Sequence, residues 1–204
     1  MRLTILGATG GIGRLLVPLA LDEGHQVTAF ARAPEKIRQT DPQLRVLGGD
    51  LFQPEAMAAA IRGSDAVLSA FGPTTLRRTH LRRDFGRTIV QAMRLAGVSR
   101  FIHVSTAFLF GEGGLVFAVM SKTLFRNVTE DHRESEQEMT QPDLAWTILR
   151  PPRLLDGRPT GHPRVVAGHL PKGGFVISRA DVAAFMLQEA VAPKYVRQVV
   201  GLSN

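Results

Sequence analysis

The 204-residue sequence predicts an α/β fold in which helices cover both faces of a doubly wound, mostly parallel sheet. Three observations favour this class. Apolar segments of strand length alternate with segments of helical periodicity along the chain. The first strand runs into a glycine-rich turn, and a helix with an apolar face follows the turn. A second strand comes within about 30 residues, as a strand–helix–strand unit requires.

The N-terminal unit carries the clearest functional signal. Its strand, the apolar run Leu3–Leu6, leads into the turn Gly7-Ala8-Thr9-Gly10-Gly11-Ile12-Gly13. Gly7 permits a tight turn, Gly10 lets the backbone approach phosphate groups, and Gly13 allows the next helix to pack closely on the strand. A strand, a glycine turn and a helix N-terminus together form a site for the pyrophosphate of a dinucleotide. The missing Gly-Lys-Ser/Thr ending excludes the phosphate loop of nucleotide hydrolases.

The other elements follow from hydrophobic periodicity and from turn residues. The first helix carries Leu15, Leu16, Leu19 and Ala20 and stops at Asp22-Glu23-Gly24. Later helices are expected from about Pro34, at Pro54–Ile61, across Leu81–Met93, from about Lys122 to Met139, and from Ile177. Further strands are expected at Gln26–Phe30, Leu44–Leu47, Ala66–Phe71, Phe101–Ser105, Ala145–Leu149 and Val196–Leu202.

The segment between Arg153 and Gly174 differs from the rest because proline and glycine are frequent in it. It is too short to form a second domain. We therefore expect one domain over residues 1–204, with an excursion at about 153–174 that faces the substrate.

Residues after the second strand distinguish the two nicotinamide dinucleotides. An acidic residue about 20 positions after the last glycine binds the ribose 2′-hydroxyl, whereas an arginine accommodates a 2′-phosphate. The segment Phe30-Ala31-Arg32-Ala33-Pro34 has no acidic residue, and Arg32 lies 19 residues after Gly13. Lys36 adds a second positive charge. These residues favour NADP(H); the alternative is that Arg32 is an ordinary exposed arginine before a helix.

Ligands of an open parallel sheet bind outside the carboxyl ends of its strands. Asp50 and Leu51 are expected to flank the adenine. Ala70, Phe71 and Gly72 would let the backbone approach the cofactor ribose. Each could instead be an ordinary strand end. The expected strand ends form one row, which consists of Gly7, Arg32, Asp50, Phe71-Gly72, Ser105-Thr106 and Pro151.

Composition narrows the function classes. The chain has no cysteine, which excludes disulfides, cysteine-ligated metals and cysteine nucleophiles. Its histidines show no metal-ligand spacing, so we expect no metal. The apolar stretches are too short to span a bilayer, and the N-terminus enters a strand directly. We therefore expect a cytoplasmic protein that has no signal peptide and does not bind membranes.

The net charge of +7 raises the question of a nucleic-acid partner. The basic residues are scattered, however, and the densest group is Arg77-Arg78 with Arg82-Arg83. One Trp and one Tyr supply little stacking on bases. An anionic cofactor and substrate explain the charge equally well, so we expect no nucleic-acid partner.

The sequence resembles the atypical branch of the short-chain dehydrogenase/reductase superfamily over nearly the whole chain. Within that NAD(P)-binding Rossmann branch it is most similar to the flavin reductase/biliverdin-IXβ reductase group. This resemblance implies an NADPH site along the strand ends, with the nicotinamide near Ser105 and Pro151-Pro152. The similar stretches are Gly7–Gly13, Gly49-Asp50, Ser105–Leu109, Thr129–Arg133, Pro151-Pro152, Thr160-Gly161 and the less specific Val176–Asp181.

One departure from the superfamily bears on the chemistry. Typical members use Tyr-x-x-x-Lys, in which the lysine lowers the pKa of the tyrosine so that it acts as acid or base. Here Lys122 has Ala118 four residues before it, and the only tyrosine, Tyr195, lies far along the chain. Alcohol–ketone interconversion is therefore disfavoured. Hydride transfer to a flavin, quinone or open tetrapyrrole needs less of the protein, because a conjugated acceptor spreads the developing charge.

Ser105 and His132 remain as catalytic candidates. Ser105 ends a strand beside the expected nicotinamide and could hydrogen-bond the substrate or the carboxamide; alternatively, it caps the following turn. His132 shares a helical stripe with Phe125, Val128 and Met139, whereas Glu130, Asp131, Arg133 and Glu134 are expected to face away. His132 is either a proton donor or a satisfied core residue. Lys122 is expected to be a cation at the start of a helix.

The sequence thus favours an NADPH-dependent reductase of a flavin, quinone or similar planar acceptor, as a monomer or homodimer. The alternative is a non-catalytic NADP(H)-sensing protein that resembles NmrA-type regulators. A sugar-nucleotide epimerase is disfavoured by the missing tyrosine and the small C-terminal part.

Overall fold

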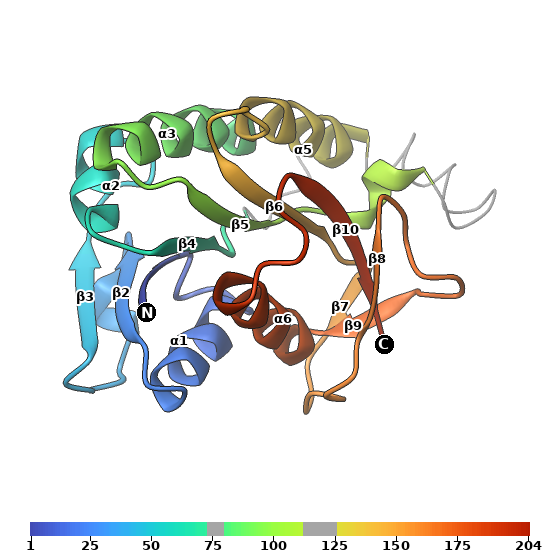
Figure 1. Ribbon diagram of the computed structural model, residues 1–204, viewed down its shortest axis with the longest axis horizontal. Coiled ribbons are helices and arrows are strands. Elements are labelled where there is room, and N and C mark those ends of the chain that lie inside the picture. The colour runs from blue at the N-terminus through green and yellow to red at the C-terminus, as the bar shows by residue number, and fades with distance from the viewer. Residues whose placement is uncertain (73–79, 112–125) are drawn as a thin grey trace.

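One eight-stranded sheet organises the molecule, with strand order β3-β2-β1-β4-β5-β6-β10-β8. Neighbouring strands pair in parallel from β3 to β10, and β8 joins β10 in the antiparallel direction. The computed structural model describes residues 1–72, 80–111 and 126–204 (Figure 1). The strands are β1 (Arg2–Leu6), β2 (Gln26–Ala31), β3 (Leu44–Gly48), β4 (Ala66–Ser69), β5 (Arg100–Val104), β6 (Ala145–Arg150), β8 (Arg164–Ala167) and β10 (Gln198–Ser203).

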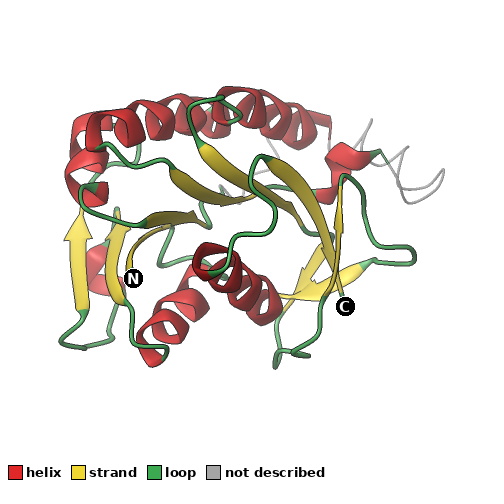
Figure 2. Ribbon diagram, in the orientation of Figure 1, coloured by secondary structure: helices red, strands yellow, loops and turns green. Residues whose placement is uncertain are grey.

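Helices cover both faces of this sheet, as Figures 1 and 2 show. The helices are α1 (Gly13–Asp22), α2 (Pro54–Ile61), α3 (Leu81–Ala96), α5 (Arg126–Met139) and α6 (Arg179–Val191). α1 and α6 pack on one face around buried residues such as Leu16 and Met186. α2, α3 and α5 pack on the other face, around Ile61 and Ile89. The predicted fold class, a doubly wound and mostly parallel α/β sheet, is confirmed.

The strand order reverses between β1 and β4, because the chain runs outward to β3 on one side and to β5 and β6 on the other. Two glycines allow the close packing at this point. Gly7 has φ +76°, and a Cβ on it would lie 2.9 Å from the backbone of Ala70 and Phe71. A Cβ on Gly13 would overlap the carbonyl oxygen of Gly7. Helix α1 therefore begins in direct backbone contact with the end of β1.

The prediction of a helix from Pro34 is wrong, because the structure has only a three-residue 3₁₀ turn, Pro34–Lys36. Ile37 is the one apolar residue among positions 35–40, so the segment offers no apolar face that could pack on the sheet. The last helix also starts later than expected. Val176–Ser178 is strand β9, and the side chain of Ser178 accepts a hydrogen bond from the Asp181 amide at the start of α6.

The excursion contains two strands that its composition did not reveal. β7 (Arg153–Leu155) pairs with β9, and β8 joins the edge of the main sheet. Asp181, which is fully buried, holds the excursion to α6. Its carboxylate accepts hydrogen bonds from the amides of Thr160 and Gly161, at 2.9 and 3.0 Å, and from the Ser178 hydroxyl at 2.7 Å.

Some expectations fall outside the described residues, namely those on Arg77, Arg78, Ala118, Lys122 and Phe125. In the ranges that the structure does describe, no helix is long and apolar enough to cross a membrane.

Gly13→Ala tests the close packing of α1 on β1. We expect this substitution to lower the free energy of unfolding by about 1–3 kcal/mol, because the added methyl group has no space. Urea denaturation measures the change. Gly72→Ala is the matched control, since a Cβ there would meet no atom within 4 Å, and it should stay within about 0.5 kcal/mol of the parent.

Candidate functional site

A cavity of about 430 Å³ opens at the carboxyl ends of β1, β2 and β4, where the strand order reverses. This is the position at which open parallel sheets bind ligands. The sequence did not single out Ala31, Ala33, Phe52 and Leu81, which also line the cavity. The predicted cofactor residues that line it are Gly7, Thr9, Gly10, Arg32, Leu51, Ala70, Phe71 and Gly72.

The glycine turn at one end of the cavity suits an anion. The Gly10 amide donates to the Gly7 carbonyl at 2.9 Å, and the Arg14 amide donates to the Gly10 carbonyl at 3.0 Å. Within the described residues, the amides of Gly11 and Ile12 have no hydrogen-bond acceptor. Together with the N-terminus of α1, these amides can receive a phosphate group. The turn is therefore a candidate site for the pyrophosphate of a dinucleotide, and this assignment stays a prediction.

Two cations stand at another part of the cavity wall. Arg32 and Lys36 both line the cavity and are solvent-exposed. Neither makes an ion pair within the part of the chain that the structure describes. Cations that lack an acidic partner can bind an anionic ligand without first breaking a salt bridge. Arg32 therefore stands where it could contact an anionic ligand, and its role toward a 2′-phosphate stays a prediction.

Aromatic rings form the cavity wall near the end of β4. Phe52 and Phe71 meet edge to face, with ring centroids 6.0 Å apart and planes at 83°. Phe71 in turn packs on buried Phe85 at 4.4 Å. Asp50, which the sequence placed beside the adenine, is not a lining residue; its carboxylate accepts a hydrogen bond from the Phe52 amide at 3.0 Å. Asp50 thus shapes the loop that positions Leu51 and Phe52.

The two predicted catalytic residues lie together at the end of β5. The Ser105 Oγ and the His132 Nδ1 are 3.2 Å apart, and both residues are buried. Ser105 does not cap the following turn, because Thr106 performs that role by accepting from the Phe108 amide. The Ser105 amide donates to the Leu149 carbonyl, and the Ala107 amide donates to the Pro151 carbonyl. These bonds place Ser105 beside Pro151, although neither residue lines the cavity, and the position of the nicotinamide near them stays a prediction.

His132 is neutral at physiological pH. Burial lowers the pKa of His132 well below its usual value, and the nearby charge of Arg82 lowers it further. A neutral imidazole carries one N–H donor and one acceptor nitrogen, so it can orient the Ser105 hydroxyl in either direction. His132 is therefore a buried histidine that hydrogen-bonds Ser105, which fits the alternative of a satisfied core residue, and its role as a proton donor stays a prediction.

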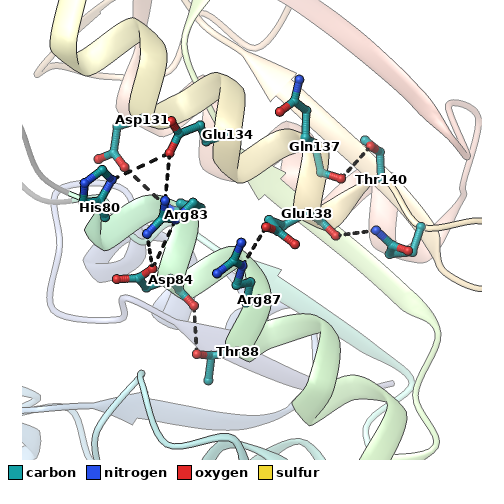
Figure 3. A network of polar contacts seen from close by, with 11 residues as sticks. His80, Arg83, Asp84, Arg87, Thr88, Asp131, Glu134, Gln137, Glu138 and Thr140 are labelled. Carbon is teal, nitrogen blue, oxygen red and sulfur yellow. Dashed lines mark hydrogen bonds and ion pairs between the residues drawn. The ribbon is translucent and has the colours of Figure 1, made fainter.

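Polar contacts between α3 and α5 hold His132 in place. Arg82 pairs with Asp131 at 3.1 Å, and both side chains are buried. The expectation that Asp131 faces away from the core is thus wrong: its charge is accommodated because Arg82, from another helix, compensates it. Figure 3 shows further contacts between α3 and α5, among them Arg83 with Glu134 and Arg87 with Glu138. The shortest distances between nitrogen and oxygen in these two pairs are 3.6 and 2.7 Å.

A second buried histidine lies deeper in the same region. The His103 Nδ1 is 3.1 Å from the Ser69 Oγ, and its ring stacks on Phe101 with centroids 5.8 Å apart. Burial lowers the pKa of His103 from 6.5 to about 3. The sequence analysis did not select His103, because its position inside an apolar strand gives no functional signal.

Tyr195 lies before the amino end of β10, whereas Ser105 follows the carboxyl end of β5. The Tyr195 carbonyl accepts from the Thr147 hydroxyl at 2.9 Å, and the Tyr195 ring packs near Phe185. It is thus remote from Ser105, and within the described ranges no tyrosine can act beside the cavity. Those ranges also contain no group of three or more His, Asp or Glu residues that could hold a metal ion.

Comparisons with known proteins agree with this geometry. Residues 7–193 match the model of the NAD(P)H-binding family. The chain is 29% identical over 206 residues to the uncharacterized protein YwnB of Bacillus subtilis, covering 96% of this chain and 94% of that protein. It is 32% identical over 117 residues to a 3 beta-hydroxysteroid dehydrogenase/isomerase of Mycobacterium tuberculosis, covering 52% of this chain and only 31% of that protein.

A solved structure of similar size shows the same arrangement of elements. ChuY, an anaerobillin reductase from Escherichia coli O157:H7, superposes with a TM-score of 0.80 at 29% sequence identity. The match covers 100% of this chain and 97% of ChuY.

The buried histidines predict how stability depends on pH. The unfolded chain protonates His103 near pH 6.5, whereas the folded protein keeps it neutral down to about pH 3. Stability is therefore complete above pH 6.5 and falls as the pH is lowered through this window, by up to about 1.4 kcal/mol per pH unit for each such histidine. Urea denaturation between pH 7 and 5 measures the slope.

His103→Gln is the matched variant, because the amide can keep the hydrogen bond to Ser69. Between pH 6.5 and 5, the free energy of unfolding of this variant should depend less steeply on pH than that of the parent protein. The expected difference in slope corresponds to about one bound proton. An unchanged slope would show that His103 is protonated in the folded state.

Proposed function

The chain belongs to the NAD(P)H-binding family, and from this premise we propose that it is an NADPH-dependent reductase of a flavin, quinone or similar planar acceptor. The cavity at the strand-order reversal carries the proposal, because it combines a glycine turn suited to a pyrophosphate with two cations that make no ion pair among the described residues. When bound, NADPH would supply the hydride.

Preference for NADPH over NADH rests on Arg32. Its guanidinium can bind a phosphate through two parallel hydrogen bonds, and Lys36 adds charge on the same wall. The adenosine would lie between the glycine turn and the Phe52–Phe71 wall, and the cofactor would extend along the strand ends toward Ser105 and Pro151.

Ser105 and His132 would orient the acceptor and transmit a proton. If the neutral imidazole donates its Nδ1–H to the Ser105 oxygen, the hydroxyl is left to donate to a carbonyl oxygen or ring nitrogen of the acceptor. Because His132 is neutral, solvent would replace the proton through the hydroxyl and the imidazole. Support for a planar acceptor comes from the remote position of Tyr195 and from the similarity to ChuY, a reductase.

Steady-state oxidation of NADPH with FMN, FAD, quinones and open-chain tetrapyrroles tests the proposal. We expect turnover with at least one of these acceptors. Ser105→Ala should lower kcat by about 10-fold or more, as is typical for loss of a group that transfers a proton. Tight NADPH binding without turnover on any acceptor would contradict the enzymatic function and support an NADP(H)-sensing regulator instead.

Arg32→Ala tests the choice of cofactor. We expect the Kd for NADPH to rise about 10- to 100-fold, because a charge-assisted contact to the 2′-phosphate is lost, while the Kd for NADH changes little. Fluorescence titration measures both constants. Arg38→Ala is the control, since Arg38 is also exposed in this segment but is not a lining residue. Equal losses for NADPH and NADH would refute the contact with the 2′-phosphate.

A further inference from the structure

We propose that Arg179, at the start of α6, is a further cofactor-binding residue that binds the pyrophosphate, and that Asp156 is its exchangeable counter-ion. This inference rests on the proposed NADPH function. It assigns a specific role to a contact between two segments that lie far apart in the sequence, the glycine turn and α6.

The first observation is that Arg179 lies directly against the glycine turn. A Cβ added to Gly11 would be 2.8 Å from the Arg179 Nε and 2.9 Å from its Cδ. The absence of a side chain at Gly11 therefore makes room for the guanidinium stem. The amide of Gly11 itself has no hydrogen-bond acceptor within the described residues. The Arg179 side chain and a backbone N–H that has no acceptor in the described part of the chain thus lie at the same residue, Gly11.

The second observation is the shared carboxylate. The Arg179 Nη1 lies 3.0 Å from the Asp156 Oδ1, and the Arg14 Nη2 lies 3.6 Å from the same oxygen. One carboxylate cannot neutralise two guanidinium groups, so these three residues retain a net positive charge beside the turn.

Asp156 can give up its place at low cost. Its side chain is 72% exposed, and the Arg14 side chain is 62% exposed, whereas that of Arg179 is only 27% exposed. Exposed ion pairs contribute little to stability, so a phosphate group that binds Arg179 can replace the carboxylate. A guanidinium binds two phosphate oxygens at once, and the diphosphate of a dinucleotide offers them with a full negative charge on each phosphate.

Binding titrations of NADPH at fixed ionic strength test the role of Arg179. We expect Arg179→Ala to raise the Kd about 10-fold or more and Arg179→Lys, which keeps the charge but not the planar fork, to have an intermediate effect. Arg94→Ala is the control, because Arg94 pairs with exposed Asp143 near the amino ends of the strands. It removes the same charge and should change the Kd less than twofold.

Adenosine 2′-monophosphate identifies which phosphate is bound. This probe has the 2′-phosphate but no pyrophosphate, so Arg179→Ala should leave its affinity unchanged, whereas Arg32→Ala should weaken it. An equal loss for the probe and for NADPH would overturn the assignment to the pyrophosphate.

Two further variants separate binding from a structural role. Gly11→Ala should weaken NADPH binding by displacing Arg179, and it should cause no further loss in the Arg179→Ala background. Asp156→Asn should lower the Kd two- to fivefold, because a competing anion is removed; weaker binding would overturn its role as a counter-ion. Circular dichroism and Tm establish that each variant is folded.

The outcomes distinguish this inference from the proposed function. Wild-type protein that fails to bind NADPH would overturn both. Wild-type binding that Arg179→Ala leaves intact would overturn the inference alone.

Discussion

The structure depends on one constraint, the direct backbone contact where β1 ends, α1 begins and β4 passes alongside. Gly7 and Gly13 leave no side chain between these elements. The contact places the first turn of α1 just beyond the strand ends, next to Gly7, Thr9 and Gly10, which line the cavity. A larger residue at either position would separate the helix from the sheet and remove both the turn and the cavity wall. The backbone of this glycine turn thus serves both the packing of α1 on β1 and the shape of the cavity.

Much of the fold could be predicted because its signals are local. The predictions of a strand at Leu3–Leu6 and of a helix across Leu81–Met93 are confirmed by β1 and α3. Strands buried on both faces and amphipathic helices have distinct hydrophobic patterns, so both could be recognised. The short strands β7, β8 and β9 could not be found, because each is defined by pairing with a distant segment. The helix expected at Pro34 failed because a proline start was not followed by an apolar face.

In the candidate site, too, features that are local in the sequence could be predicted and contacts between distant segments could not. Glycine spacing and Arg32 are readable from the sequence, because the turn and the following strand are continuous in the chain. The contact between Ser105 and His132 depends on how α5 packs over β5, which no local pattern encodes. Asp131 was misplaced for a related reason: a carboxylate on a helix is expected to be exposed unless its partner is known, and Arg82 lies on another helix.

The neutral state of the two buried histidines has a consequence for the distribution of charge along the strand ends. Arg32 and Lys36 bring positive charge to the cavity, whereas neutral His103 and His132 add none near Ser105. An oxidised nicotinamide ring is itself a cation, and an imidazolium beside it would repel it. Under the proposed function, burial of these histidines therefore keeps the affinities for the two redox forms of the cofactor closer together.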